Sequence, residues 1–225
     1  MRKTAVVIIV LLMFASCASI RSTKPFTVDL DSSHYPAGSA EAQFEKLMGG
    51  SLKKGDISAS YYPEEDAVCL EFRADTLYFS QFWSRDGRDA FIAALEQYKT
   101  DYAERNLVEK TSKTKKAYGQ VKGYIAWSLM RILSEPARGV ALINMGYTFK
   151  EGAPFFVLTQ RSAEYKEPGT SRKTTSPVVL MYLTRAQAEE LAILFSQDYL
   201  DKLDSSGGVD SESFRDILRK LFRSR

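Results

Sequence analysis

Short turns between neighbouring apolar segments are the feature that most restricts how this chain can fold. Three segments with strand character, 56–62, 67–73 and 76–83, follow one another with only short gaps between them. A crossover to a parallel strand needs a dozen or more residues, so these strands must be antiparallel neighbours joined by hairpins. The carboxylates of Glu64, Glu65 and Asp66 lie on the first hairpin turn, and we interpret them as a solvated loop.

A second series of strand patterns follows a polar linker that carries Lys110, Lys113, Lys115 and Lys116. Its four segments are 121–129, 139–148, 154–165 and 177–183. The second and third of these are predicted to form a hairpin that turns at Lys150-Glu151-Gly152, because glycine suits a tight turn between strands.

Each series ends in an amphipathic helix whose apolar residues recur at the spacing of one buried stripe. The first stripe comprises Phe91, Leu95, Tyr98 and Tyr102, and the second comprises Leu191, Leu194, Phe195, Tyr199 and Leu203. Thr184 and Gln187 have the spacing of a capping box, in which each side chain satisfies an amide at the start of the helix. We also predict a short helix that begins at Ser39, with Ala40, Phe44, Leu47 and Met48 on one face.

The two helix starts align at a constant offset of one hundred positions, with Ser84 opposite Thr184 and Gln97 opposite Gln197. This offset suggests half-repeats over about 52–108 and 117–204, although two unrelated strand-to-helix junctions would look similar. The predicted fold class is therefore α+β. It has antiparallel sheet of about seven strands, two main covering helices and an optional pseudo-twofold β-β-β(-β)-α repeat.

The amino-terminal residues have the pattern of an export signal. Arg2 and Lys3 precede an uncharged run over residues 4–16. This run is shorter than the about 20 apolar residues that a transmembrane helix needs. A charged start, a short apolar middle and small residues at the end are typical of a secretory signal peptide. The sequence therefore predicts that the chain leaves the cytoplasm.

The end of this signal, Phe14-Ala15-Ser16-Cys17, resembles the lipobox of bacterial lipoproteins. Phe14 stands where leucine is commonest, and relaxed versions of the motif occur in some bacterial groups, spirochaetes among them. The resemblance implies that Cys17 is lipidated and becomes the first mature residue. It also implies that the protein is extracytoplasmic and lipid-anchored to the cell membrane or the outer membrane. The alternative is an ordinary signal peptide cut after Ser16 or Ser19.

These patterns divide the chain into a signal peptide over 1–16, a lipidated cysteine with its tether over 17–38, and one α+β domain over 39–225. A basic amphipathic helix over 210–223 would end the domain, either covering its own core or lying on anionic headgroups or a partner. Without Arg2 and Lys3 the formal charge falls from +3 to +1, which gives no argument for an anionic partner.

No catalytic, cofactor-binding or metal-binding constellation can be identified in the sequence. The single histidine, His34, lies in the predicted tether, and Cys69 lies in a strand, where we expect it to be buried. One histidine and one free cysteine are too few for a tetrahedral zinc site. A carboxylate pair acting across a groove stays open as an alternative, because such residues can be far apart in sequence.

Two surface features have open interpretations. The lysines over 110–116 and the segment 161–173 form either a basic patch or solvated loops. One strand carries four aromatic residues that are distributed over both of its faces: Tyr78, Phe79, Phe82 and Trp83. Either both faces of this strand are covered, or some of the rings line a groove or contact surface.

The predicted function is therefore that of a non-catalytic binding or interaction module at the cell envelope. Its partners would be membrane lipid through Cys17 and an envelope protein or small molecule. An envelope hydrolase with unidentified carboxylates is the alternative. The order of strands and helices is also similar in outline to the Pur-repeat and Whirly families of single-stranded nucleic-acid binders. That resemblance would imply nucleic-acid binding, but no motif of theirs is present and an extracytoplasmic location argues against it.

Overall fold

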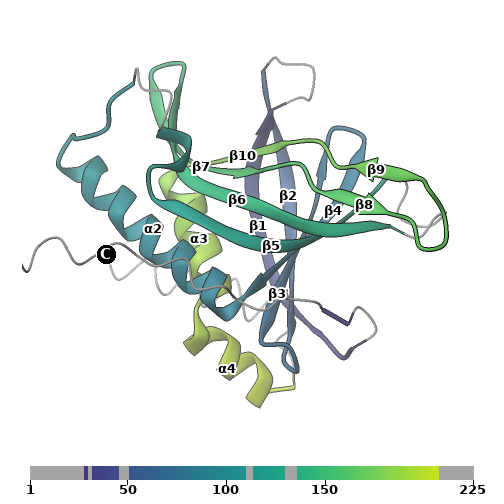
Figure 1. Ribbon diagram of the computed structural model, residues 1–225. Helices are drawn as coiled ribbons and strands as arrows, with labels where there is room; N and C mark the ends of the chain where they lie inside the picture. The colour runs from purple at the N-terminus through teal and green to yellow at the C-terminus, as the bar shows by residue number, and fades with distance from the viewer. Residues whose placement is uncertain (1–27, 30–31, 46–50, 110–113, 130–135, 208–225) are drawn as a thin grey trace, which may run out of the picture.

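The structure is a computed structural model that describes residues 28–29, 32–45, 51–109, 114–129 and 136–207. Within these residues, eight antiparallel strands close into a barrel in the order β1-β10-β7-β6-β5-β4-β3-β2. Three α-helices of the described residues pack against the barrel, and Figure 1 shows α2 and α3 together on one side of it.

The first four strands are β1 (Tyr35–Glu45), β2 (Leu52–Tyr62), β3 (Ala67–Ala74) and β4 (Leu77–Ser84), and they lead into α2 (Arg85–Ala103). The short helix η1 (Thr114–Lys116) precedes β5 (Gly119–Ser128), β6 (Ala137–Lys150) and β7 (Ala153–Gln160). A two-stranded excursion, β8 (Glu164–Lys166) and β9 (Lys173–Thr175), comes before β10 (Val179–Leu183). The described chain ends with α3 (Arg185–Phe195) and α4 (Gln197–Ser205).

The predicted fold class is wrong, because the sheet is closed and has eight strands instead of an open arrangement of about seven with two covering helices. The missing strand is β1, which pairs with β2 along nearly its whole length and with β10 at Gln43 and Phe44. Residues from Ser39 onward were predicted to form a helix, and in the structure Ser39–Glu45 is strand. Ala40 and Phe44 fit one face of a helix, but Ala40, Ala42 and Phe44 also alternate, and pairing on both sides decides for strand.

Several local predictions are confirmed. Thr184 and Gln187 form the capping box at the start of α3, and Ser84 caps α2 through a hydrogen bond from the Gly87 amide. Glu151 and Gly152 both have positive φ, as a two-residue hairpin turn between β6 and β7 requires. The helix predicted after Thr184 differs in one respect, because it is divided in two. The extended backbone of Ser196 separates α3 from α4.

One apolar core fills the barrel and extends under the helices. Strand residues such as Ile57, Leu70 and Ile143 belong to the same buried cluster as Phe91 of α2 and Leu194 of α3. Alanines on the inner face of β1 leave space for helix packing, and Tyr199 of α4 donates a hydrogen bond to the Ala37 carbonyl at 2.6 Å. The helices therefore complete the core of the barrel.

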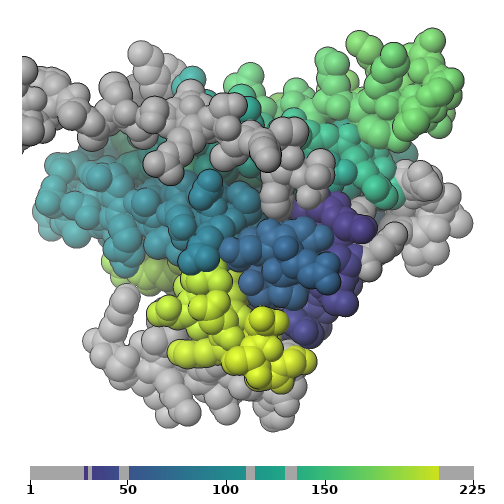
Figure 2. Space-filling view, turned by 60° about the horizontal axis from the view of Figure 1, so that its bottom comes forward, coloured from purple at the N-terminus to yellow at the C-terminus, as the bar shows by residue number. Residues whose placement is uncertain are grey.

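In the space-filling view of Figure 2, α4 (yellow) lies on the surface next to α2 (teal). The β8–β9 hairpin (light green) stands out from the barrel in the same view. Gly139 of β6 makes close contact with the base of this hairpin, since a Cβ there would lie 3.0 Å from the Glu164 carbonyl oxygen.

Candidate functional site: a polar groove on the barrel wall

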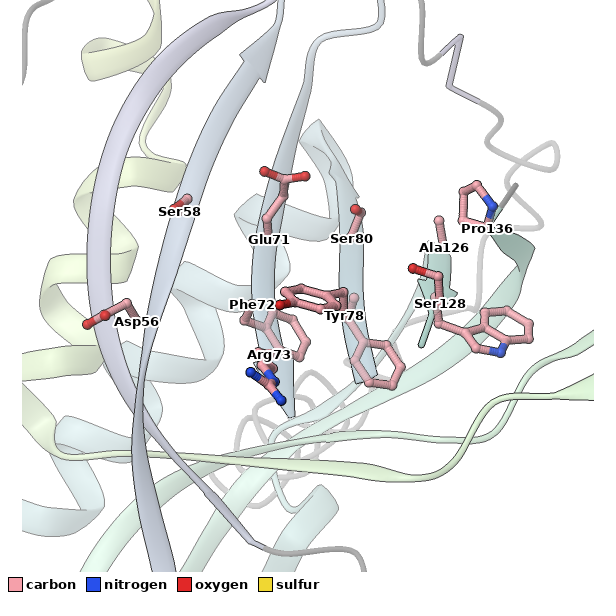
Figure 3. Close-up of a pocket in the computed structure, with 12 residues that line it drawn as sticks. Asp56, Ser58, Glu71, Phe72, Arg73, Tyr78, Ser80, Ala126, Ser128 and Pro136 are labelled. Carbon is pink, nitrogen blue, oxygen red and sulfur yellow. The ribbon is translucent and has the colours of Figure 1, made fainter. Parts of the chain in front are cut away.

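A groove of about 400 Å³ lies on the outer face of strands β2 to β5. Its lining comes from four neighbouring strands and from the residue that precedes β6 (Figure 3): Asp56, Ser58, Glu71, Phe72, Arg73, Tyr78, Phe79, Ser80, Ala126, Trp127, Ser128 and Pro136. We call this set the groove.

The outward-facing residues of the groove form two rows across the strands, because antiparallel pairing places them opposite one another. One row is Ser58, Glu71, Ser80 and Ala126. In the other row Arg73 pairs with Tyr78 and Tyr78 with Ser128, and Asp56 lies one residue beyond the last pair of β2 with β3. Alternate residues of a strand point to opposite faces, so these polar residues lie on the face away from the core.

Tyr78 and Arg73 form a pair within the groove. The Arg73 guanidinium lies 5.5 Å from the centre of the Tyr78 ring, which is a cation–π distance. Its Nε donates a hydrogen bond to the Asp75 carbonyl oxygen at 2.9 Å, which fixes the guanidinium at the β3–β4 turn. Figure 3 shows the Tyr78 ring lying across β3 between Glu71 and Arg73. The groove thus contains one half-buried ring held between polar groups.

Buried aromatic residues support the floor of the groove. Phe72 and Phe79 stack with ring centres 5.6 Å apart, and Phe44 stacks on Phe72 at 5.2 Å. This ladder joins β1, β3 and β4 directly behind the groove, and stacked rings of this kind resist small displacements of the strands. The site is therefore built on the rigid wall of the barrel.

A small apolar cluster lies beside the groove on the same outer face. Val28 packs there with side chains of β2, β3 and β4, namely Tyr62, Ala67, Cys69 and Phe82. His34 stacks on Tyr62 at 4.8 Å. The Ser32 hydroxyl donates to the Glu65 carboxylate at 2.9 Å. The described residues that precede β1 therefore cover part of the outer face beside the groove.

The charges near this cluster are mainly negative. Burial, with smaller contributions from the neighbouring Cys69 and from the Glu71 carboxylate, raises the pKa of Tyr62 to about 12. Burial also raises the pKa of the Cys69 thiol, again with a contribution from Glu71. Cys69 is buried as expected, and both groups stay protonated at neutral pH.

A second set of polar side chains lies inside the barrel. Gln81 donates to Gln160 across the barrel at 2.9 Å and accepts a hydrogen bond from the Trp83 indole at 2.8 Å. These side chains are almost fully buried, and they include no nucleophile or ionisable group. We therefore assign this network to the packing of the barrel.

The carboxylate cluster on the β2–β3 turn has a larger role than a solvated loop. The guanidinium of Arg88 in α2 is 1% exposed and contacts the Asp66 carboxylate. The same guanidinium donates to the backbone carbonyls of Asp66 and Phe195 at 3.1 and 3.0 Å and to Gln197. Asp66 thus helps to hold α2 between the barrel and the α3–α4 junction.

The other residues singled out in the sequence have different outcomes. Cys17, Lys110, Lys113 and the helix predicted over 210–223 lie outside the described residues. His34 is exposed, stacks on Tyr62, and its Nδ1 lies 3.4 Å from the backbone carbonyl oxygen of Ser32. The segment 161–173 forms most of the β8–β9 hairpin. Of the four alternating aromatic residues, Phe79, Phe82 and Trp83 are buried and Tyr78 lines the groove.

Asp56, Glu71 and Arg73 were not predicted from the sequence to be neighbours. The sequence does contain a signal for them. Polar residues at alternate positions of each predicted strand lie on one face, and hairpin pairing places them opposite the polar residues of the next strand. In the described part of the chain, no group of three or more histidine, cysteine, aspartate or glutamate side chains could hold a metal ion. No helix among the same residues combines the length and the apolar character needed to cross a membrane.

The fold and the groove define a closed antiparallel β-barrel with an open polar site on its wall. Residues 37–202 match the family described as "Uncharacterised Treponema protein", and the chain belongs to that family. No curated protein and no solved structure matches the chain.

Proposed function

We propose that the protein is a lipid-anchored, extracytoplasmic binding module whose ligand occupies the groove on β2–β5. Support for the location comes from the sequence: a short apolar leader precedes Cys17 in a segment that resembles a lipobox. The family is described from Treponema, a spirochaete, and relaxed lipoboxes with residues other than leucine occur in that group. The diacylglyceryl cysteine would hold the protein at either the cell membrane or the outer membrane.

The observation that carries the binding proposal is the composition of the groove. Its volume of about 400 Å³ lies within the range of about 300–1,000 Å³ that small-ligand sites occupy. Hydroxyl, carboxylate and guanidinium groups from four strands converge there around one half-buried ring. A rigid floor with polar groups in fixed positions favours specific binding, because little ordering is needed when the ligand arrives.

Catalysis by carboxylates is the less favoured alternative for the same groove. A carboxyl group that acts as a general acid is kept protonated by burial. Asp56 is exposed and Glu71 is only half-buried, so neither has that environment. The groove also has no histidine or cysteine in its lining.

Nucleic-acid binding is not favoured by the charges of the groove. Proteins that bind nucleic acids neutralise phosphates with lysine and arginine. The groove presents two carboxylates, Asp56 and Glu71, against the single guanidinium of Arg73. A phosphate backbone would therefore meet a net negative site.

The location is tested by labelling with a radioactive fatty acid. We expect the label in the native chain and none in the Cys17→Ala variant, because acylation requires the thiol. Label in both chains, or in neither, contradicts the anchor.

Binding is tested by NMR with the purified full chain and a library of polar small molecules of several chemical classes. We expect at least one compound to shift resonances of the groove, and the Tyr78→Ala variant to lose this effect. Lys122→Ala is the matched control, since Lys122 is exposed on β5 outside the groove lining. A library that shifts only resonances elsewhere on the barrel contradicts the binding proposal.

A further inference from the structure

We infer that the groove binds a neutral saccharide, with the Tyr78 ring against the apolar face of a sugar and the polar rows against its hydroxyl groups. This inference rests on the proposed binding function and names the ligand class for the same site.

The hydrogen-bonding groups of the groove require a ligand that both donates and accepts. Carboxylate oxygens such as those of Asp56 and Glu71 accept hydrogen bonds, whereas serine hydroxyls both donate and accept them. Three serines and one tyrosine line the groove beside the two carboxylates. A molecule with many hydroxyl groups can satisfy this mixture, since each hydroxyl is a donor and an acceptor at once.

The two-row arrangement suits a ring with substituents on opposite edges. Glu71 lies in one row and Arg73 in the other, and the Tyr78 ring lies between them in Figure 3. A pyranose ring has a face of C–H groups and hydroxyls around its rim. Such a ring can pack flat on the tyrosine while its rim hydroxyls contact both rows.

The charges of the groove disfavour an anion, and at the Tyr78 ring they also disfavour a cation. A cationic amine would seek the face of the Tyr78 ring, but the Arg73 guanidinium already lies 5.5 Å from the ring centre and would repel it. An anion would meet the Asp56 and Glu71 carboxylates. A saccharide without charged groups avoids both penalties.

The shape of the site adds a further restriction. The groove lies on the outside of the barrel wall, and Asp56 and Arg73 at one end are exposed. A ligand longer than one ring can therefore extend beyond the groove without entering the core. This geometry points to an oligosaccharide or a glycan chain end.

The test measures binding of the purified full chain, in detergent, to a panel of neutral oligosaccharides, with spermidine, an amino-acid mixture and a single-stranded DNA oligonucleotide as the other probes. We expect at least one oligosaccharide to bind and to shift groove resonances. We expect Tyr78→Ala to weaken binding about tenfold or more and Tyr78→Phe to retain most of it, because the phenylalanine ring keeps the stacking surface. Lys122→Ala should bind as the native chain does.

Salt provides a second readout that separates the ligand classes. The dissociation constant for a neutral ligand should change little as the salt concentration rises, whereas binding of a charged probe should weaken. Binding of spermidine, amino acids or DNA in the groove, with no oligosaccharide bound, would overturn the saccharide inference and leave the binding function in place. Absence of groove binding by every probe would overturn both.

Discussion

Replacement of Asp66 and of Arg88 should destabilise the protein to different degrees, because the two partners differ in burial. Arg88 is 1% exposed, and the Asp66 side chain is 33% exposed and lies 3.6 Å from Arg85. Burial lowers the pKa of Arg88, and the Asp66 charge opposes this shift. Asp66→Asn therefore leaves a buried guanidinium without its counter-charge. The cost of removing one partner of a buried pair is about 3–5 kcal/mol, and the partial exposure of Asp66 places the expected value near about 3 kcal/mol.

The reverse replacement, Arg88→Met, removes the buried charge together with its desolvation cost. It leaves the backbone carbonyls of Asp66 and Phe195 without the guanidinium, at a cost of about 1–3 kcal/mol that the apolar methionine partly offsets. We expect a loss of about 1–2 kcal/mol in the free energy of unfolding. In the Asp66→Asn variant the backbone adds no further cost, because asparagine adopts the positive φ of 46° at residue 66 more readily than most residues.

Urea unfolding followed by tryptophan fluorescence measures these losses, since Trp83 and Trp127 are both buried in the core. The double variant should be about as stable as Arg88→Met alone, because the asparagine then has no buried charge to leave unpaired. A larger loss for Arg88→Met than for Asp66→Asn would refute the argument from the uncompensated charge. Equal and additive losses would refute the coupling between the two side chains.

Three further predictions concern the barrel. Burial raises the pKa of Glu45, but hydrogen bonds from Tyr182 and Lys150 and the Lys150 charge outweigh it and lower the pKa below 4.5. The interactions of the Glu45 carboxylate with Tyr182 and Lys150 therefore stabilise the fold above about pH 4.5. This stabilisation is lost as the pH falls through the lowered pKa of Glu45. Urea unfolding should show Tyr182→Phe about 1.5–3 kcal/mol less stable near pH 7, with a smaller loss in acid, and a pH-independent difference would contradict this. Gly139→Ala should lower the thermal midpoint because its Cβ meets the β8 backbone. Gly87→Ala lies in α2, and its Cβ would make only ordinary contacts with Trp83 and Ser84, so it should leave the midpoint unchanged or raise it; the opposite order would contradict this packing. Cys69 should react with a thiol reagent only after unfolding, and rapid reaction of Cys69 in the native chain would show that it is accessible.

The local structure was largely predictable because its signals lie within short segments. The hairpins between β2, β3 and β4, the turn at Glu151-Gly152 and the capping box at Thr184 each depend on a few neighbouring residues. The start of α3 at Arg185 follows from the same local chemistry. Such elements can be read from residue type and spacing alone.

Closure of the barrel was not predictable from the same signals. It depends on pairing between Gln43 and Tyr182, which are far apart in the chain, and no local pattern reports such a contact. The alanines of β1 also carry little apolar signal, although Ala40 and Ala42 are buried. The prediction of the fold class was therefore wrong at β1, where most of the buried side chains are alanines.

The candidate site depended on the same long-range information. Tyr78 was recognised as a residue that could line a groove, but Asp56 and Glu71 became neighbours only through the register of β2, β3 and β4. Likewise, Asp66 looked like one of three solvated carboxylates until α2 placed Arg88 beside it. Pairing and helix packing, and not residue type, set these positions.

The order of the strands has a consequence for how the chain folds as it is synthesised. β1 is the first barrel strand to leave the ribosome and β10 is the last, yet the two must pair to complete the cylinder. Until β10 emerges, β1 and β7 keep unpaired backbone amides and carbonyls that can recruit other chains. A nascent chain arrested before Val179 is thus an open sheet with two unpaired edges, so the speed of synthesis through the last barrel strand decides how long each molecule is exposed to aggregation.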